Sequence, residues 1–167
     1  MYRARRLPHH VAMTSPASPA SPVPRIVLDT NVCLDLFLFR DPACAPLMAA
    51  LQDGRVQAVC RDDGREEWRR VLHYPQLPID EAIRPGLSDA FDRLIRYLPA
   101  AELSGEDAAR LPRCADPDDQ KFMQLALASQ ARWLLSKDNE LLKLDRRTHG
   151  AGLFRILLPQ HWAGPLD

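Results

Sequence analysis

Two acidic residues follow apolar segments that have the composition of buried strands. Asp29 comes directly after Ile26-Val27-Leu28, and Asp138 comes shortly after Trp133-Leu134-Leu135. Such segments are typical of parallel sheets covered on both faces. The carboxyl ends of their strands form the edge at which α/β proteins place ligands and chemistry. Asp29 is therefore either a metal ligand or catalytic acid, or a cap of the helix that follows it.

Two further acidic segments are expected at the same edge. Glu66 and Glu67 lie in a charged helix after the second predicted strand, and Asp116-Pro117-Asp118-Asp119 heads an amphipathic helix. A helix dipole explains some acids at a helix start. Four acidic positions from four chain crossings, however, would repel one another and raise their own pKa values unless a cation compensates. Carboxylates without neighbouring His or Cys favour Mg²⁺ or Mn²⁺ over zinc.

The elements that must position these acids alternate between strand and helix. This order predicts an α/β fold, a three-layer α/β/α sandwich around a central, mostly parallel sheet. The expected strands are 26–28, 56–60, 133–136 and 154–158. The expected helices are 32–39, 42–51 with Asp41 as its cap, 61–74, 80–98, the run between Asp119 and Ser129, and 139–144. An extended piece is expected at 99–103 and a loop at 104–113.

Composition predicts one soluble globular domain. The chain has 167 residues, of which 46% are hydrophobic and 26% are charged, and this suits a single core. The Ser/Pro/Ala-rich segment 1–24 is expected to be a disordered tail, 25–160 the folded domain, and 161–167 a C-terminal tail. Arg3, Arg5 and Arg6 in the first tail could contact an RNA backbone, but an inert extension is the favoured interpretation.

Net charge, cysteine spacing and hydropathy limit the kinds of protein that this sequence can encode. The formal net charge is zero, so no global basic field indicates nucleic-acid binding, although an acidic site would cancel basic residues elsewhere. The cysteines form no C-x-x-C pair and are expected to be reduced core residues of a cytoplasmic protein. No apolar segment is long enough to span a membrane.

The acidic motifs, taken together and in order, resemble the PIN domain family. The segments that carry the resemblance are Ile26–Asn31, Glu67-Trp68, Asp116–Asp119 and Ser136-Lys137-Asp138, within residues 25–159. PIN domains are metal-dependent ribonucleases, and they include the VapC toxins of bacterial toxin–antitoxin pairs. The subgroup with an Asp-Pro-Asp-Asp segment and a Glu-Glu helix is the most similar in appearance.

The resemblance assigns roles to individual positions. It implies that Asp29, Glu67, Asp119 and Asp138 are catalytic and bind the metal, with Asp116 as an auxiliary metal ligand. Trp68 supplies the apolar residue that the family places after its second acid, so Glu67 is favoured over Glu66. Asn31 and Ser136 would orient water or a ligand carboxylate, with Ser136 where the family usually has Thr. Thr30 or Asn31 would then cap the first helix in place of Asp29.

The implied activity is a metal-dependent endoribonuclease that hydrolyses RNA phosphodiester bonds with metal-activated water. The implied setting is the toxin of a type II toxin–antitoxin pair, with RNA, a cognate antitoxin and a possible homodimer as partners. Arg65, Lys121 and Lys137 are candidate RNA contacts, although a solvated helix face is the favoured interpretation of each. Lys137, next to Asp138, would be close enough to compete with the metal.

Other classes fit the residues less well. A haloacid dehalogenase-type phosphotransferase needs a second acid where Asn31 stands, and no G-x-G-x-x-G follows the first strand to bind a dinucleotide. The remaining alternative is a catalytically inactive PIN-fold module that binds RNA or acts as a scaffold.

Overall fold

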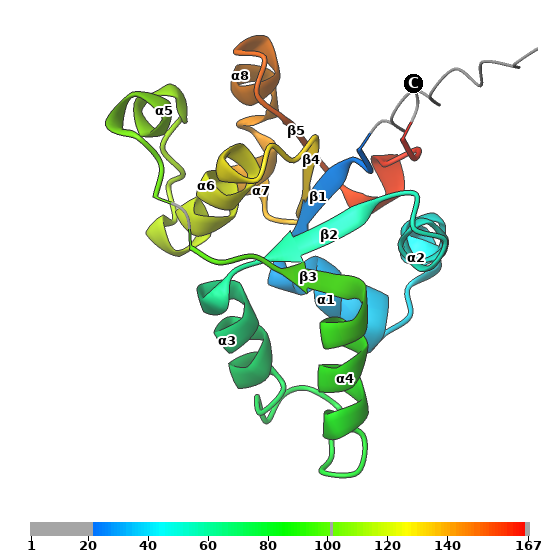
Figure 1. Ribbon diagram of the computed structural model, residues 1–167. Helices are drawn as coiled ribbons and strands as arrows, with labels where there is room; N and C mark the ends of the chain where they lie inside the picture. Colours follow the sequence, from blue (N-terminus) through cyan, green and yellow to red (C-terminus); the bar gives the residue numbers. More distant parts are fainter. Residues whose placement is uncertain (1–21, 101, 166–167) are drawn as a thin grey trace, which may run out of the picture.

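A computed structural model describes residues 22–100 and 102–165 of the chain (Figure 1). These residues form a five-stranded sheet of order β3-β2-β1-β4-β5, in which every neighbouring pair is parallel. The predicted α/β class with a parallel central sheet is confirmed. The strands are β1 Arg25–Leu28, β2 Gln57–Cys60, β3 Ile95–Tyr97, β4 Trp133–Leu135 and β5 Arg155–Leu157.

Helices cover both faces of the sheet and so make three layers (Figure 1). One layer holds α1 Thr30–Phe37, α2 Ala45–Gln52, α3 Asp62–Val71 and α4 Arg84–Leu94. The other side holds α5 Gly105–Arg110, α6 Gln120–Ala128, α7 Asn139–Leu142 and α8 Asp145–Gly150. Three short 3-10 turns, η1 Pro42–Cys44, η2 Pro117–Asp119 and η3 Pro159–His161, complete the described elements.

The central strand β1 divides the core between the two layers. Ile26 and Leu28 pack into the cluster on the α1–α4 side, whereas Val27 packs with α6 on the other side. This alternation follows from the two-residue period of a strand. On the first side Trp68 of α3 stacks on Phe91 with ring centroids 5.3 Å apart. The stacked pair ties α3 to α4 and so determines where the neighbouring Glu67 lies.

The segment from residue 80 to 103 differs from the prediction. The expected helix 80–98 ends at Leu94, and its last part is strand β3, which pairs with β2 through Ala58 and Ile95. Apolar residues here satisfy a helical period, but the free edge of β2 offers backbone hydrogen bonds that a longer helix would leave unused. Leu98 to Ala100 and Glu102 to Ser104 carry no strand, so the extended piece expected at 99–103 was placed too late.

Two short helices were not expected. The predicted loop 104–113 contains α5, whose N-cap Ser104 accepts a hydrogen bond from the Asp107 backbone N–H at 3.0 Å. A serine followed three residues later by an acid is a recognisable helix start, so this signal was available in the sequence. The second is α8, which follows α7 almost without interruption.

Several local predictions are confirmed. Asp41 caps η1, accepting a hydrogen bond from the Ala43 N–H at 2.9 Å. The four cysteines are free and buried.

The packed core extends past the expected domain boundary at residue 160, because Trp162 is buried against Trp133 with ring centroids 5.7 Å apart. The predicted N-terminal tail lies largely outside the described residues. Within the described ranges, no helix is long and apolar enough to cross a membrane.

Candidate active site

Asp29 and Asp138 meet at the carboxyl edge of the sheet through Ser136. Strands β1 and β4 are neighbours in register at Leu28 and Leu135, so the residues that follow them lie side by side. The Ser136 hydroxyl donates a hydrogen bond to Asp29 Oδ2 at 2.7 Å, and the Asp138 N–H donates to Ser136 Oγ at 3.0 Å. One fully buried serine thus connects the ends of two strands.

Asp29 occupies the N-cap position of α1, but its carboxylate does not make a capping hydrogen bond. The side chain is only 5% exposed and is directed to Ser136. Burial raises the pKa of Asp29, as does the charge of Glu67, while the Ser136 hydroxyl and nearby backbone N–H groups oppose that rise. The expectation that Thr30 or Asn31 takes over the cap was wrong, because the backbone of Asp29 itself begins the helix.

Asp119 joins this pair from the start of α6. Its carboxyl group is hydrogen-bonded to that of Asp138, and burial together with the charges of Asp29, Asp138 and Asp116 raises the pKa of Asp119 to about 7. Two carboxyl groups share a hydrogen bond only when one of them holds a proton. The three acids therefore concentrate negative charge at one point of the sheet edge.

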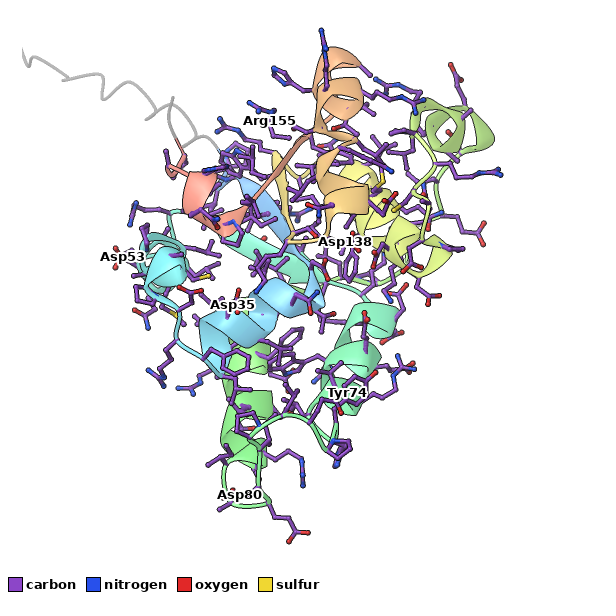
Figure 2. The ribbon with its side chains drawn as sticks, turned by 180° about the vertical axis from the view of Figure 1, so that it is seen from behind. Asp35, Asp53, Tyr74, Asp80, Asp138 and Arg155 are labelled. Carbon is purple, nitrogen blue, oxygen red and sulfur yellow. The ribbon has the colours of Figure 1, made fainter. Side chains whose placement is uncertain are left out.

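The carboxylates of Asp138 and Asp116 also accept hydrogen bonds from backbone N–H groups two residues further along the chain. Asp138 lies where the loop after β4 approaches α1 and α6 (Figure 2), and it accepts a hydrogen bond from the Glu140 N–H at 2.8 Å. Asp116 is exposed and accepts from the Asp118 N–H at 2.9 Å, which caps η2. Asp116 therefore reaches the cluster through its charge, whereas Asp138 is a direct member.

Glu67 approaches the cluster from α3. The burial of Trp68 orients this part of the helix, leaving Glu67 half-buried and Glu66 exposed. Lys121 Nζ lies 2.9 Å from Glu67 Oε2, and that oxygen is buried and has no well-aligned hydrogen bond. The charge of Glu67 acts on Asp29. The four predicted acids are therefore connected electrostatically: Asp119 interacts with Asp29 and Asp138, and Glu67 interacts with Asp29.

The three predicted RNA contacts each have a carboxylate partner in the protein. Arg65 makes two hydrogen bonds to Asp92, at 3.1 and 3.0 Å, and Lys121 pairs with Glu67. Lys137 Nζ lies 2.8 Å from Asp35 Oδ2, on α1 (Figure 2). In the structure Lys137 therefore forms its ion pair with Asp35 and not with the adjacent Asp138. Asn31 is exposed on the first turn of α1.

The donor set fits a hard divalent cation, although the side chains are not arranged around one. Among residues 22–100 and 102–165, no three His, Cys, Asp or Glu side chains form a ready metal-binding group. Protein donors hold the carboxylates instead: Ser136 on Asp29, Lys121 on Glu67 and the start of α7 on Asp138. Four carboxylate side chains with no His among them match the ligand preference of Mg²⁺ or Mn²⁺. Their mutual repulsion is what a cation would relieve.

Two supporting residues were missed by sequence reasoning. Gln120 accepts a hydrogen bond from the Cys114 N–H at 2.7 Å and donates to the Pro112 carbonyl at 3.2 Å, which holds the loop before Asp119. Asp35 binds Lys137 and thereby fixes the loop between Ser136 and Asp138. Asp35 is the one acid within the apolar segment 32–39, and an isolated buried acid indicates a cationic partner.

These features define an α/β protein with an acidic site at the carboxyl edge of a parallel sheet. A family model described as the PIN domain matches residues 25–140, most of the chain, and the chain belongs to the PIN domain family. This confirms the resemblance inferred from the motifs. A search of curated proteins found no match.

The fold is also similar to that of a solved structure. The similar chain belongs to the crystal structure of VapBC2 from Rickettsia felis, a complex bound to a DNA fragment from its promoter. The two chains match with a TM-score of 0.53 and are 14% identical. The match covers 80% of this chain and 96% of that one. At this identity the likeness shows a shared fold, which agrees with the PIN family assignment.

Proposed function

We propose that this PIN domain is a metal-dependent endoribonuclease that hydrolyses RNA phosphodiester bonds. The observation that carries the proposal is the convergence of Asp29, Asp119 and Asp138 at one sheet edge, where burial and the neighbouring carboxylates raise the pKa of Asp119. Structural carboxylates are ordinarily separated or paired with cations, because crowding them costs stability. Sites that retain such crowding are functional-site candidates.

Each side chain has a role in this proposal. Asp29, Glu67, Asp119 and Asp138 would hold one or two Mg²⁺ or Mn²⁺ ions, with Asp116 as an auxiliary ligand. When bound, the metal would supply an activated water and would stabilise negative charge on the phosphate. Ser136 orients the Asp29 carboxylate. Asp119, with its pKa at about 7, can hold or release a proton near neutral pH. The proposal requires no side-chain nucleophile.

RNA contacts are proposed for Arg65, Lys121 and Lys137, whereas Asn31, two residues after Asp29, would orient water or a ligand carboxylate. Lys121 is the best placed of the three basic residues, because its ammonium already lies in the acidic site. This ammonium would offer a positive charge to an RNA phosphate held at the site. Arg65 and Lys137 would have to leave Asp92 and Asp35 to contact RNA.

We also propose that the protein is the toxin of a type II toxin–antitoxin pair, with a cognate antitoxin that covers the acidic edge. The similar fold found in VapBC2 supports this partnership.

Free buried cysteines suit a reducing compartment such as the cytoplasm. A homodimer is proposed through the exposed apolar residues Phe39 and Ile83, and a strictly monomeric mass in size-exclusion chromatography would contradict it.

The test is cleavage of a labelled RNA with Mn²⁺ or Mg²⁺. Asp29→Asn nearly preserves the shape of the side chain, so we expect a folded protein without activity. Asp89→Asn removes an exposed acid from α4 and is the matched control. Activity that needs the metal, disappears in EDTA and is lost only in Asp29→Asn supports the nuclease. Full activity in Asp29→Asn contradicts it.

A second candidate is a PIN-fold module that binds RNA or a protein without cleaving. The feature that favours this role is the direct pairing of Glu67 with Lys121, which neutralises one of the four acids without a metal. This alternative predicts RNA or partner binding that is unchanged by Mn²⁺ and by Asp29→Asn.

A further inference from the structure

An arginine stands at or beside the amino end of every strand of the sheet. Arg25 and Arg155 are the first residues of β1 and β5, and Arg96 is the second residue of β3. Arg132 immediately precedes β4, and Arg55 stands just before β2. Because the strands are all parallel, these arginines share one edge of the sheet, opposite the edge that carries the acids.

Four of the arginines line a single open groove of about 1020 Å³, beside the described ends of the chain. The strand order β3-β2-β1-β4 sets them in a row as Arg96, Arg55, Arg25 and Arg132. The described residues that line the groove include no acidic and no aromatic side chain. Arg155 is separate from the groove and pairs with Asp145 at 3.0 Å.

Within the described residues, the charges of Arg25, Arg55 and Arg96 are little compensated by their neighbours. Arg25 Nη1 donates to the Ser129 carbonyl at 3.2 Å, which fixes the side chain without neutralising it. Arg55 has an ion pair with Asp53 at 3.5 Å, in which both side chains are more than half exposed. Exposed pairs of this kind contribute little and are easily exchanged. Arg96 is exposed at the far end of the row.

The dimensions of the row fit a nucleic-acid backbone. Neighbouring strands lie about 4.8 Å apart, so four strands spread the arginines over roughly 15 Å. A helical nucleic-acid strand advances about 3.4 Å per phosphate, and such a row would face about four phosphates. Guanidinium groups match phosphate oxygens in a two-point geometry that lysine does not provide.

We propose that this arginine groove binds the phosphate backbone of RNA at a second contact, remote from the acidic site. The proposal rests on the proposed ribonuclease function. An acidic protein segment is the competing ligand, but protein interfaces depend on buried aromatic or aliphatic anchors. The groove offers arginines, prolines and small residues, with Val23 as its large apolar side chain.

Two properties of binding follow. The described residues of the lining include no aromatic side chain on which bases could stack, so we expect contact with the groove to be independent of sequence. Since the groove and the acids occupy opposite edges of the sheet, an RNA that contacts both must extend around the domain. The groove therefore favours long or folded RNA over short oligonucleotides.

The experiment compares two double variants that lose the same charge. Arg55→Gln/Arg96→Gln removes two exposed arginines from the groove, and Arg146→Gln/Arg147→Gln removes two exposed arginines from α8. Fluorescence anisotropy with a labelled single-stranded RNA, long enough to wrap around the domain, is measured in EDTA at increasing salt. Circular dichroism melts of both variants verify folding.

We expect the groove variant to bind RNA about tenfold more weakly at low salt. The slope of log affinity against log salt should become shallower by about 1.4, or about 0.7 for each lost phosphate contact. The control should keep the wild-type slope. Equal affinities and slopes for the two variants would overturn the proposal, as would a defect seen with polyglutamate but not with RNA. Wild-type protein that binds RNA through the groove but does not cleave it with Mn²⁺ would instead contradict the proposed nuclease.

Discussion

Lys121 Nζ lies 2.9 Å from Glu67 Oε2, within the acidic site, and the two side chains are 23% and 25% exposed. Lys121 also packs against Phe122, with its ammonium 5.2 Å from the ring centroid. The ammonium group therefore neutralises Glu67, one of the four carboxylates that would hold the metal in the proposed site. The same lysine is a candidate contact for RNA. Its position can therefore influence the binding of both proposed ligands of the site, the metal ion and the RNA.

Removing Lys121 should strengthen metal binding. In Lys121→Met the apolar stem is retained, but the competing charge is lost. We expect about fivefold tighter binding of Mn²⁺, equivalent to about 1 kcal/mol for a partly buried charge pair. Isothermal titration calorimetry without RNA measures this. Lys143→Met, which breaks the exposed pair with Glu140 on α7, is the matched control and should bind as wild type does. Weaker or unchanged Mn²⁺ binding in Lys121→Met would show that the ion pair does not oppose the metal.

The hydrogen bond from Ser136 to Asp29 should contribute to stability. Ser136→Ala leaves a buried carboxylate oxygen without its donor. We expect the free energy of unfolding to fall by about 1–3 kcal/mol, as measured by urea denaturation. Ser129→Ala is the control, because the Ser129 hydroxyl is buried without a hydrogen-bond partner among the described residues. Its removal should be neutral or stabilising. Equal losses in both variants would argue against a specific role for Ser136.

Stability should depend on pH through Asp119. Its pKa is raised from 3.8 to about 7, so folding favours the protonated carboxyl. The resulting stabilisation is fully present below pH about 4 and is lost as the pH rises to about 7. Relative to Asp119→Asn, the wild type should therefore lose thermal stability across that range. Melting curves at successive pH values measure the difference, and parallel curves would contradict the shift. Mn²⁺, which binds the ionised form, should reverse the loss near neutral pH.

Lys137 and Asp35 should be energetically coupled. Asp35 is buried, and Lys137→Met would leave its carboxylate without the ammonium 2.8 Å away. Because the Lys137 side chain is 45% exposed, we expect a coupling of only about 1 kcal/mol. A double-mutant cycle with Asp35→Asn, followed by urea denaturation, measures it. Strictly additive losses would mean that the pair does not hold the loop between Ser136 and Asp138.

The sequence by itself determined the class of fold and the acids. Asp29 and Asp138 were recognisable because apolar segments of strand length end just before them, and chain direction in a parallel sheet brings such ends together. The ordered acidic motifs also identified the family. These signals are local, or depend only on the order of elements along the chain.

Only the tertiary structure decided which charges face one another. The segment 95–97 became β3 because β2 had a free edge, a preference that no local period expresses. Lys137 turned to Asp35 rather than to the adjacent Asp138, and Lys121 turned to Glu67, because salt bridges depend on distances between side chains of separate elements. Four arginines at the amino ends of β1 to β4 form a row for the same reason. They are scattered along the chain, and only the parallel pairing of the strands places them on one edge.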